Sequence, residues 1–563
     1  MSTAYSPDAA NGNLRLAMAV AASALRGNDL NLFSQAAGLF QNAISLDPDS
    51  PDALLEFAVF LAHSGHFASA GTWFESALRK PPSPRAVLEY AQLLEKLERF
   101  PEALAWYSRL DGRPLEVDLR MARLERRCGN FEAARARLTA LEHNANGAAE
   151  KIQLAKAATL AGAERLSEAI AVHERALGLA RAGDLRGGTS AAKAGEGGLQ
   201  ITMVCWGEAV VQSFLEVGLP NQLSSGNIPA IAGEPGVTYR IYTSTKDIDR
   251  LLNHPALRAL SSMVPVELFT FPAELVAKAE SKYELANCCH QHAVLGANLL
   301  SKSLIFLSPD SIISDGCLSR LLSLKRSGVG TVLCSGPRVT KESALPELVR
   351  TASKRAIHGV QTLAVSSRDL VRVILNHPHH AMLGSYVDSG FVTDSWSCVF
   401  IEIEGTGLLA RQLHLHPLMV TPQRRSVLPF GTIDTAYVGE ACPDWSRIHV
   451  VEDSDSLCAL SWSEHSENAT MSKYPEAPWS KAQVIAHLAR RHITAFNIEL
   501  LQHRIRFHAE DIGPAWAAEE ARSDAVVRDI TQNLQARWFS RGGAEAQEPP
   551  ARARTFSAAE ALL

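Results

Sequence analysis

The sequence predicts a multidomain fold in which an all-α repeat array precedes an α/β domain of the Rossmann type, with helices at the C-terminal end. Two observations predict it. The first third repeats a pattern of small and aromatic residues at nearly constant spacing, and the middle alternates apolar runs with amphipathic segments, as in an open sheet covered on both faces. The expected units are helical repeats in 1–180, a flexible linker in 181–198, the α/β domain in 199–475, a helical segment in 476–540 and a disordered tail in 541–563.

Composition excludes several classes of protein. The 563 residues carry a net charge of −5, without the basic stripe expected of a nucleic-acid binder. No uncharged apolar run approaches the roughly 20 residues that cross a membrane, and no secretory signal is evident. The nine cysteines show no C-x-x-C spacing, which favours buried, reduced thiols. We therefore expect a cytoplasmic protein that binds no nucleic acid and has no membrane span.

The repeat pattern is set by alanines that are 34, 33, 31 and 35 residues apart, namely Ala36, Ala70, Ala103, Ala134 and Ala169. Aromatic residues follow several of them, and prolines separate the units. This resembles the tetratricopeptide repeat, a pair of helices with a period of about 34 residues. Alanine allows two helices to approach closely, and stacking of the units buries faces that one unit cannot bury alone. We expect the array over 31–180, with 13–28 as an extra helix.

The linker and the start of the α/β domain are distinguished by composition. Residues 181–198 contain six glycines and have low hydrophobicity, which is typical of a flexible segment. The apolar run 200–208 predicts the first strand, and 238–243 predicts the second. Toward the C-terminus, 397–404 and 409–419 predict adjacent strands, and 481–509 and 515–538 predict two long amphipathic helices.

A central strand ends in an acid. The apolar run Leu304–Leu307 is followed by Ser308-Pro309-Asp310, and ligands of open α/β sheets bind beyond the carboxyl ends of strands. A carboxylate at this tip is well placed to hold a divalent cation or a ribose hydroxyl. The alternative is that Asp310 serves only the turn, because Pro-Asp pairs are common there.

The first strand with its turn (ITMVCWGE), the second strand (YRIYTSTKD) and the strand ending in FLSPDS together resemble a nucleotide-sugar glycosyltransferase of the GT-A type. The resemblance covers about 200–461. It implies that the first strand tip cradles the nucleotide and that a central strand ends in an Asp-x-Asp pair that binds Mn²⁺ or Mg²⁺ and the sugar diphosphate. Asp310 takes the position of the last acid, but Ser308 stands where the first would be. Either Asp315 compensates, or the site needs no metal and Arg338 or a lysine screens the diphosphate.

Residues at the first two strand tips are candidates for binding the nucleotide. Trp206 could stack on a base, Gly207 lets the backbone approach a ligand, and Glu208 follows directly. Thr243 offers a hydroxyl at the end of the second strand. Trp206 could equally belong to the core, and the neighbouring Ser244 could cap a helix.

Polar residues of a predicted helix and the later histidines are further candidates. In 283–293, Asn287 and His290 lie near one helix face and could point toward the donor sugar, although a structural histidine is the alternative. His416, at an apparent strand end, is the preferred histidine ligand for a metal beside Asp310. It shares a strand face with His414 if the strand is regular. His379 and His380 are expected in an exposed loop, and a metal hydrolase built on the histidines of 376–380 and 414–416 is a third interpretation.

Asp434 is the candidate general base of an inverting transfer, because it follows an apolar residue on a predicted loop. The acidic cluster 452–455 is interpreted instead as a solvated turn. The resulting hypothesis is a glycosyltransferase that moves a sugar from a nucleotide-diphosphate donor to a hydroxyl of a protein, such as a surface or flagellar protein, recruited by the repeats. The alternative is a non-catalytic scaffold with a degenerate α/β domain. The repeats and the terminal helices each offer a surface for a homo-oligomer.

Overall fold

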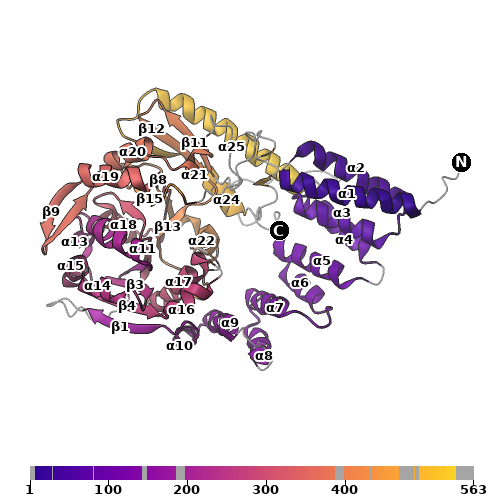
Figure 1. Cartoon of the computed structure of the whole chain (residues 1–563), viewed down its shortest axis with the longest axis horizontal. Helices are drawn as coiled ribbons and strands as arrows, with labels where there is room; N and C mark the ends of the chain where they lie inside the picture. Colours follow the sequence, from indigo (N-terminus) through magenta and orange to yellow (C-terminus); the bar gives the residue numbers. More distant parts are fainter. Residues whose placement is uncertain are drawn as a thin grey trace.

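The computed structural model places a helical array beside a larger region of sheets and helices (Figure 1). The structure describes residues 7–27, 29–79, 82–142, 149–185, 197–279, 281–386, 398–429, 431, 433–467, 483, 487–488 and 494–539. The predicted tail 541–563 therefore lies outside the described residues.

Paired antiparallel helices form the N-terminal array. Their bounds are α1 (Pro7–Gly27), α2 (Leu30–Leu46), α3 (Pro51–His63), α4 (Phe67–Ala77), α5 (Pro84–Lys96), α6 (Phe100–Tyr107), α7 (Leu115–Arg127), α8 (Phe131–Glu142), α9 (Ala149–Gly162) and α10 (Leu166–Leu177). The helix predicted over 13–28 is confirmed as the later part of α1.

The repeated small residues lie where neighbouring helices touch. The alanines at 36, 70, 103, 134 and 169 are all fully buried. Aromatic rings fill the space beside them, as in the pairs Phe40–Phe57, with ring centroids 5.4 Å apart, and Phe74–Tyr90, at 5.6 Å. Short side chains let the helix backbones approach, and the rings supply most of the buried apolar area.

The main sheet, among the described residues, has eight strands in the order β1-β4-β3-β2-β5-β13-β7-β14. Their bounds are β1 (Ala180–Leu185), β4 (Val266–Phe271), β3 (Thr238–Ser244), β2 (Leu199–Val204), β5 (Ser303–Leu307), β13 (His416–Val420), β7 (Thr331–Cys334) and β14 (Ile448–Val450). The pairs from β4 to β5 are parallel, and so are β7 and β14. Strand β13 runs antiparallel to both of its neighbours, and β1 runs antiparallel to β4.

Three smaller sheets flank the main one. They are β6-β15-β8, β10-β9 and β11-β12-β16. Their strands are β6 (Ser311–Ile313), β15 (Ala459–Ser463), β8 (Arg338–Thr340), β9 (Ser353–Ile357), β10 (Val360–Ala364), β11 (Cys398–Ile403), β12 (Gly407–Gln412) and β16 (Ile505–His508).

Helices cover both faces of the main sheet, and each face has its own apolar core. One face carries α11 (Glu208–Ser213), η1 (Phe214–Gly218), α12 (Leu219–Gln222), α13 (Ile228–Ile231), α14 (Ile248–Asn253), α15 (Pro255–Met263) and α18 (Cys317–Arg326). The remaining helical segments of this region are α16 (Ala273–Lys278), α17 (Lys282–Leu299), α19 (Lys341–Thr351), α20 (Ser367–Asn376), α21 (His380–Leu383), α22 (Thr435–Ala441), η3 (Trp445–Arg447) and α24 (Ala495–Leu501). Burial on both faces explains why the strands are continuous apolar runs in the sequence.

The predicted linker differs from the structure at its start. Residues 181–185 belong to β1, which pairs with β4 at the edge of the main sheet. An edge strand can carry glycines and charged residues, because water reaches one side of it. The same composition is typical of a flexible linker, which is why the sequence predicted one here. Residues 186–196 lie outside the described residues.

The C-terminal segment is also less helical than predicted. In place of one long helix over 481–509, the described residues contain the short helix α24 and the strand β16, which pairs with β12. The second predicted helix is confirmed as α25 (Ala515–Phe539). Likewise, the strand predicted over 409–419 divides into β12 and β13, which belong to different sheets.

The last repeat helix packs directly on the α/β region. Helix α10 lies along α17 (Figure 1), and the Nε2 of His173 donates a hydrogen bond to the carbonyl oxygen of Cys288 over 2.8 Å. Beside it, the Glu174 carboxylate contacts His292 Nε2 at 3.2 Å, and His292 Nδ1 contacts the Tyr242 hydroxyl at 2.7 Å. The array is thus joined to a helix that also lines the main sheet.

Candidate functional site

The order of the strands defines where a ligand would bind. From β2 the chain moves outward to β3 and β4, then returns to β5 on the opposite side of β2. Such a reversal opens a crevice at the carboxyl ends of the two strands, where open α/β sheets hold their ligands. The tips of β2 and β5 carry Trp206-Gly207 and Ser308-Pro309-Asp310. We use the name switch-point site for the group of Asp310, His416, His290, Asn287 and Lys282.

Asp310 lies just beyond β5 and is partly buried. Its carbonyl oxygen accepts a hydrogen bond from the backbone N–H of Trp462 over 3.0 Å, which fixes the backbone of the turn. Within the described parts of the chain, no group donates a hydrogen bond to its carboxylate, so the carboxylate remains available to a ligand. Its negative charge contributes to raising the pKa of Lys282 and opposes the lowering of the pKa of His416.

His416 begins β13 and reaches the same edge because β13 runs opposite to β5. Its Nε2 donates to the carbonyl oxygen of Phe306 over 2.9 Å, since a carbonyl can only accept. In the neutral ring this leaves the lone pair of Nδ1 free for a cation. His416 is exposed at the surface, and loss of water around its ring nitrogens lowers its pKa against the opposing effects of the Phe306 carbonyl and Asp310. A lowered pKa favours the neutral ring that binds a metal.

His290 and Asn287 lie on α17, and His290 faces β5. The His290 ring packs edge-on against Phe306, with ring centroids 5.7 Å apart. Burial, and then the neighbouring His416, lower the pKa of His290 to about 4. Among the described residues, His290 Nδ1 and Asn287 Oδ1 are buried without a hydrogen-bond partner.

Two more buried polar atoms at the carboxyl edge lack a partner among the described residues. They are Thr243 Oγ1 at the end of β3 and Ser335 Oγ directly after β7. A buried polar atom without a partner costs roughly 1–3 kcal/mol. His290 Nδ1 and Asn287 Oδ1 lie together on α17, whereas Thr243 and Ser335 lie at the ends of strands that three other strands separate.

The residues present fit a divalent cation that a substrate helps to hold. Asp310 offers a carboxylate and His416 a ring nitrogen, and Mg²⁺ or Mn²⁺ completes its coordination with phosphate oxygens and water. Asp315, the acid that could compensate for Ser308, uses one carboxylate oxygen within the fold. Its Oδ1 accepts a hydrogen bond from the N–H of Gly226 over 2.7 Å and holds a loop that is distant in the sequence.

Lys282 supplies positive charge that the sequence did not reveal. Burial disfavours its ammonium group, but the bond to Glu467 and the charges of Glu467 and Asp310 outweigh this and raise the pKa of Lys282. The positive charge of Arg338, on β8, acts on the carboxylate of Glu467. Although burial works in the opposite direction, Lys282, Ser463 and Arg338 together lower the pKa of Glu467. Arg338 and Lys282 are thus both near Glu467 at this edge.

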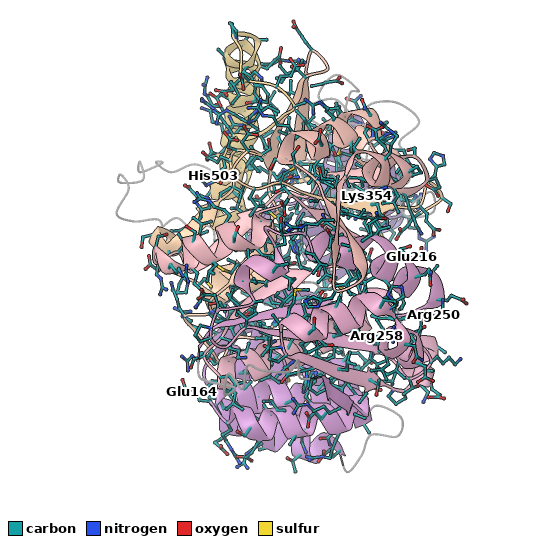
Figure 2. All side chains as sticks on the ribbon, turned by 90° about the vertical axis from the view of Figure 1, so that its left-hand side faces the viewer. Glu164, Glu216, Arg250, Arg258, Lys354 and His503 are labelled. Carbon is teal, nitrogen blue, oxygen red and sulfur yellow. The ribbon has the colours of Figure 1, made fainter. Side chains whose placement is uncertain are left out.

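The predicted nucleotide-binding residues of the first strand tip have different surroundings. The Trp206 ring packs edge-on against Phe271 at 5.6 Å and is partly buried. Gly207 has a φ of 86° and donates its N–H to Asp247 Oδ2 over 2.9 Å. Glu208 is exposed and forms an ion pair with Arg250, which Figure 2 labels at the outer surface near Arg258. Glu208 therefore faces outward into a surface ion pair.

Asp434 lies directly before α22, a helix that contacts β13. It caps α22, where its Oδ1 accepts hydrogen bonds from the N–H groups of Ala436 and Tyr437 at 2.9 and 3.4 Å. Burial raises the pKa of Asp434 against the opposing effects of these two bonds and of His414. Helix α22 packs on β13, the strand that begins at His416.

The remaining candidate histidines form hydrogen bonds within the protein. His414 lies before β13, outside a regular strand, and its Nδ1 contacts Thr435 Oγ1 at 3.0 Å. His379 is fully buried, contrary to the predicted exposed loop, since it caps α21 and donates to the carbonyl of Glu464 over 3.1 Å. His377 pairs with Glu347 at 2.8 Å. In the described part of the chain, residues 376–380 form no group of metal-ligating atoms.

A cavity of about 600 Å³ lies elsewhere, between β12, β16 and α25. It is lined by Arg411, Glu452, Gln502, Arg504, Arg506, Asp524, Val527, Arg528, Thr531 and Gln532. Arg411 and Arg504 both pair with Asp524, and Arg506 pairs with Glu520. Because most of its positive charge is neutralised internally, this cavity is a weaker candidate for an anionic ligand than the switch-point site.

Comparisons with known proteins identify the first part of the chain. A model of the tetratricopeptide repeat family matches residues 28–84 and 74–115. Similar solved structures include YrrB, described as a TPR protein with an unusual peptide-binding site, with 18% identity over 30% of this chain and 85% of that one and a TM-score of 0.27. Two others are pilF of Pseudomonas aeruginosa (19% identity, 29% and 75% coverage, TM-score 0.24) and a thermophilic TPR protein of Thermus thermophilus (22%, 30% and 91%, 0.21).

No curated protein matches this chain. Across the described residues, no helix has both the length and the apolar character needed to span a bilayer. Tetratricopeptide repeats indicate a surface for protein interaction. The N-terminal region of this chain thus contains tetratricopeptide repeats, and a region of mixed sheets and helices follows it.

Proposed function

We propose that the α/β region is a GT-A-like glycosyltransferase that moves a sugar from a nucleotide-diphosphate donor to a hydroxyl of a protein recruited by the repeats. The observation that supports the proposal is the placement of Asp310 after β5 and of His416 at the start of the antiparallel neighbour β13, with His290 packed on β5, at the strand reversal between β2 and β5. A fold can host many functions, so the proposal rests on this site and on the resemblance of its strand tips.

The donor diphosphate would bind beside Asp310. A divalent cation held by Asp310 and His416 would supply charge that stabilises the leaving diphosphate. Lys282 and Arg338 would add positive charge from the rim, although both also serve Glu467. Asn287 and His290 would hydrogen-bond the sugar, because their buried atoms lack partners among the described residues. Thr243 and Trp206 would contact the nucleoside.

Asp434 is the proposed general base. In the transfer, the acceptor oxygen forms a bond to the anomeric carbon, the bond from that carbon to the phosphate oxygen breaks, and the hydroxyl proton passes to the Asp434 carboxylate. A carboxylate whose pKa is raised by burial accepts a proton more readily near neutral pH. The second oxygen of Asp434 is the one free for this role, because Oδ1 caps α22.

The repeats would deliver the acceptor. The array ends on α17, the helix that also carries Asn287 and His290, so a protein segment held by the repeats would lie close to the switch-point site. This arrangement gives the repeats a role in positioning as well as in binding.

Isothermal titration of the full chain with UDP and GDP, with and without Mn²⁺, tests the proposal. We expect one of them to bind, more tightly with Mn²⁺, and Asp310→Asn to weaken that binding at least about tenfold. Asp249→Asn is the matched control, since Asp249 is an exposed residue of α14 outside the site.

The two functional hypotheses give different results. If neither nucleotide binds, or if Asp310→Asn binds as well as the control, the enzyme proposal fails. A partner retained by the repeats in the same preparation would then favour the scaffold, in which the α/β region is catalytically silent.

A further inference from the structure

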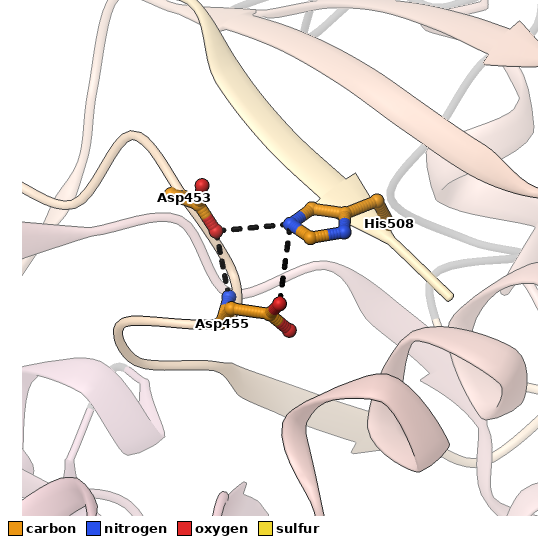
Figure 3. Close-up of side chains that lie close together, drawn as sticks. All are labelled: Asp453, Asp455 and His508. Carbon is orange, nitrogen blue, oxygen red and sulfur yellow. Dashed lines mark hydrogen bonds and ion pairs between the residues drawn. The ribbon is translucent and has the colours of Figure 1, made fainter. Parts of the chain in front are cut away.

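We propose a zinc site formed by Asp453, Asp455 and His508, outside the switch-point site. One side-chain ligand atom from each of the three lies within 4.8 Å of the others. Figure 3 shows both carboxylates and the imidazole directed toward a common point. The site would join the turn after β14, at the edge of the main sheet, to β16 of the C-terminal sheet.

The hydrogen bonds of His508 point to a cation. Its Nδ1 donates to the carbonyl oxygen of Glu510 over 2.8 Å, so in the neutral ring Nε2 carries a lone pair. That nitrogen faces Asp453 Oδ1 at 2.9 Å and Asp455 Oδ2 at 3.9 Å. Nε2 can face two carboxylates only if it carries a proton or if a cation lies between them, and the second arrangement is the site proposed here.

The hydrogen bond of Nδ1 and the burial of the ring match a metal-binding histidine. Ligating histidines commonly donate their other N–H to a carbonyl or carboxylate, which fixes the tautomer and the ring orientation. His508 is only 4% exposed, so its orientation is set by the surrounding protein and not by solvent. Its own backbone N–H donates to Ser454 Oγ over 3.1 Å, which binds β16 to the turn between the two aspartates.

The distances suit zinc. Ligands about 2.1 Å from a tetrahedral ion are roughly 3.4 Å apart, and the two nitrogen–oxygen distances of 2.9 and 3.9 Å lie on either side of this value. One imidazole with two carboxylates favours Zn²⁺, then Mn²⁺, over Mg²⁺, which prefers oxygen ligands alone. Three protein ligands leave a fourth position for water.

The competing cation in the structure is Arg368. It binds Asp455 at 2.9 Å and also Asp511 at 2.7 Å. When Asp455 turns to the metal, Asp511 still holds the guanidinium, so the arginine keeps a partner.

Zinc titration of the full-length, chelator-treated protein tests the site. We expect one equivalent bound here, a higher unfolding temperature with zinc, and at least about tenfold weaker binding in Asp453→Asn and His508→Gln. Asp249→Asn is the matched control here too, because it removes an exposed carboxylate of α14 and no proposed ligand. Asp310→Asn should also keep the site, which separates it from the switch-point site.

Because His508 is buried, its variant could fail to fold, and Asp453→Asn, in a partly exposed turn, then decides alone. Absence of zinc binding would overturn the proposal. The contact between His508 and Asp453 would then be explained by a protonated imidazole that donates to the carboxylate. Equal zinc binding in Asp453→Asn and in the control would also overturn it, because the ion would then bind elsewhere. His503→Gln, at a nearby surface position labelled in Figure 2, should leave binding unchanged.

Discussion

His173 and Cys288 connect the two parts of the molecule through one buried hydrogen bond of 2.8 Å, from the imidazole Nε2 of the last repeat helix to a backbone carbonyl of α17. Cys288 lies between Asn287 and His290, the two α17 residues of the switch-point site that lack hydrogen-bond partners among the described residues. The position of the array is therefore fixed on the helix that presents these side chains.

Replacing His173 should weaken this connection. His173→Ala leaves the Cys288 carbonyl without its donor and opens a cavity, so we expect a loss of about 1–3 kcal/mol in the free energy of unfolding. Urea denaturation measures it. His63→Ala, at the exposed end of α3, is the control and should change stability by less than about 0.5 kcal/mol. Equal effects of the two variants would contradict the role of this bond.

Stability should fall in mild acid because buried histidines must become charged. Burial lowers the pKa of both His173 and His290 to about 4, from 6.5 in the unfolded chain. The unfolded chain then binds more protons between these values, so stability is complete above pH 6.5 and is lost as the pH falls toward 4. Denaturation midpoints measured from about pH 7.5 to about pH 4.5 check this. In His173→Gln, the pH dependence should be shallower.

Asp434→Asn should separate catalysis from folding. Asparagine caps a helix about as well as aspartate, so α22 should keep its stability. The amide cannot accept the acceptor's proton, and we expect the rate of sugar transfer or donor hydrolysis to fall about 10²–10⁴-fold with little change in KM. Asp444→Asn, which caps the exposed segment η3, is the control. Unchanged turnover in Asp434→Asn would exclude Asp434 as the base.

His416→Gln should alter the metal dependence of donor binding. Glutamine can still donate to the Phe306 carbonyl, but it lacks the ring Nδ1 that would bind the cation. Calorimetry should show that Mn²⁺ no longer strengthens nucleotide-diphosphate binding, while binding without Mn²⁺ stays the same. If both affinities fall together, His416 contacts the nucleotide or supports the fold, and the metal assignment is incorrect.

Gly207→Ala should cost stability through the backbone alone. Gly207 has a φ of 86°, and a Cβ placed there would meet no atom within 4 Å. The expected cost of forcing an L-residue into this conformation is about 1–3 kcal/mol. Gly233→Ala, also without neighbours within 4 Å but without a positive φ, is the control. If Gly207→Ala leaves stability unchanged, the backbone after β2 adopts another conformation at no cost.

The sequence predicted the parts of this fold that depend on local periodicity. The alanine spacing located the repeats, and the apolar run before Asp310 located the strand tip at the sheet reversal, because these signals lie within one segment. The edge strand β1 was missed because its partner β4 lies about 85 residues away, and its own composition resembles a linker.

The contacts among distant side chains were also beyond prediction. Nothing in the spacing of Asp453 and His508 indicates that they meet, and Lys282 was not a candidate because its proximity to Asp310 arises only when α17 packs beside β5. Asp315, by contrast, was a plausible ligand, and the structure shows that one of its carboxylate oxygens bonds to Gly226. The type of a residue and its position after a strand identify candidate ligands in the sequence. Only the packing of distant elements determines which of these side chains lie close together.

The reversed direction of β13 has a consequence for biosynthesis. Its first residue, His416, is translated more than a hundred codons after Asp310, so a ribosome-bound chain can complete its helical repeats long before the ligand edge is whole. A nascent polypeptide released before that point would carry its repeats but lack one of the two residues proposed to hold a cation.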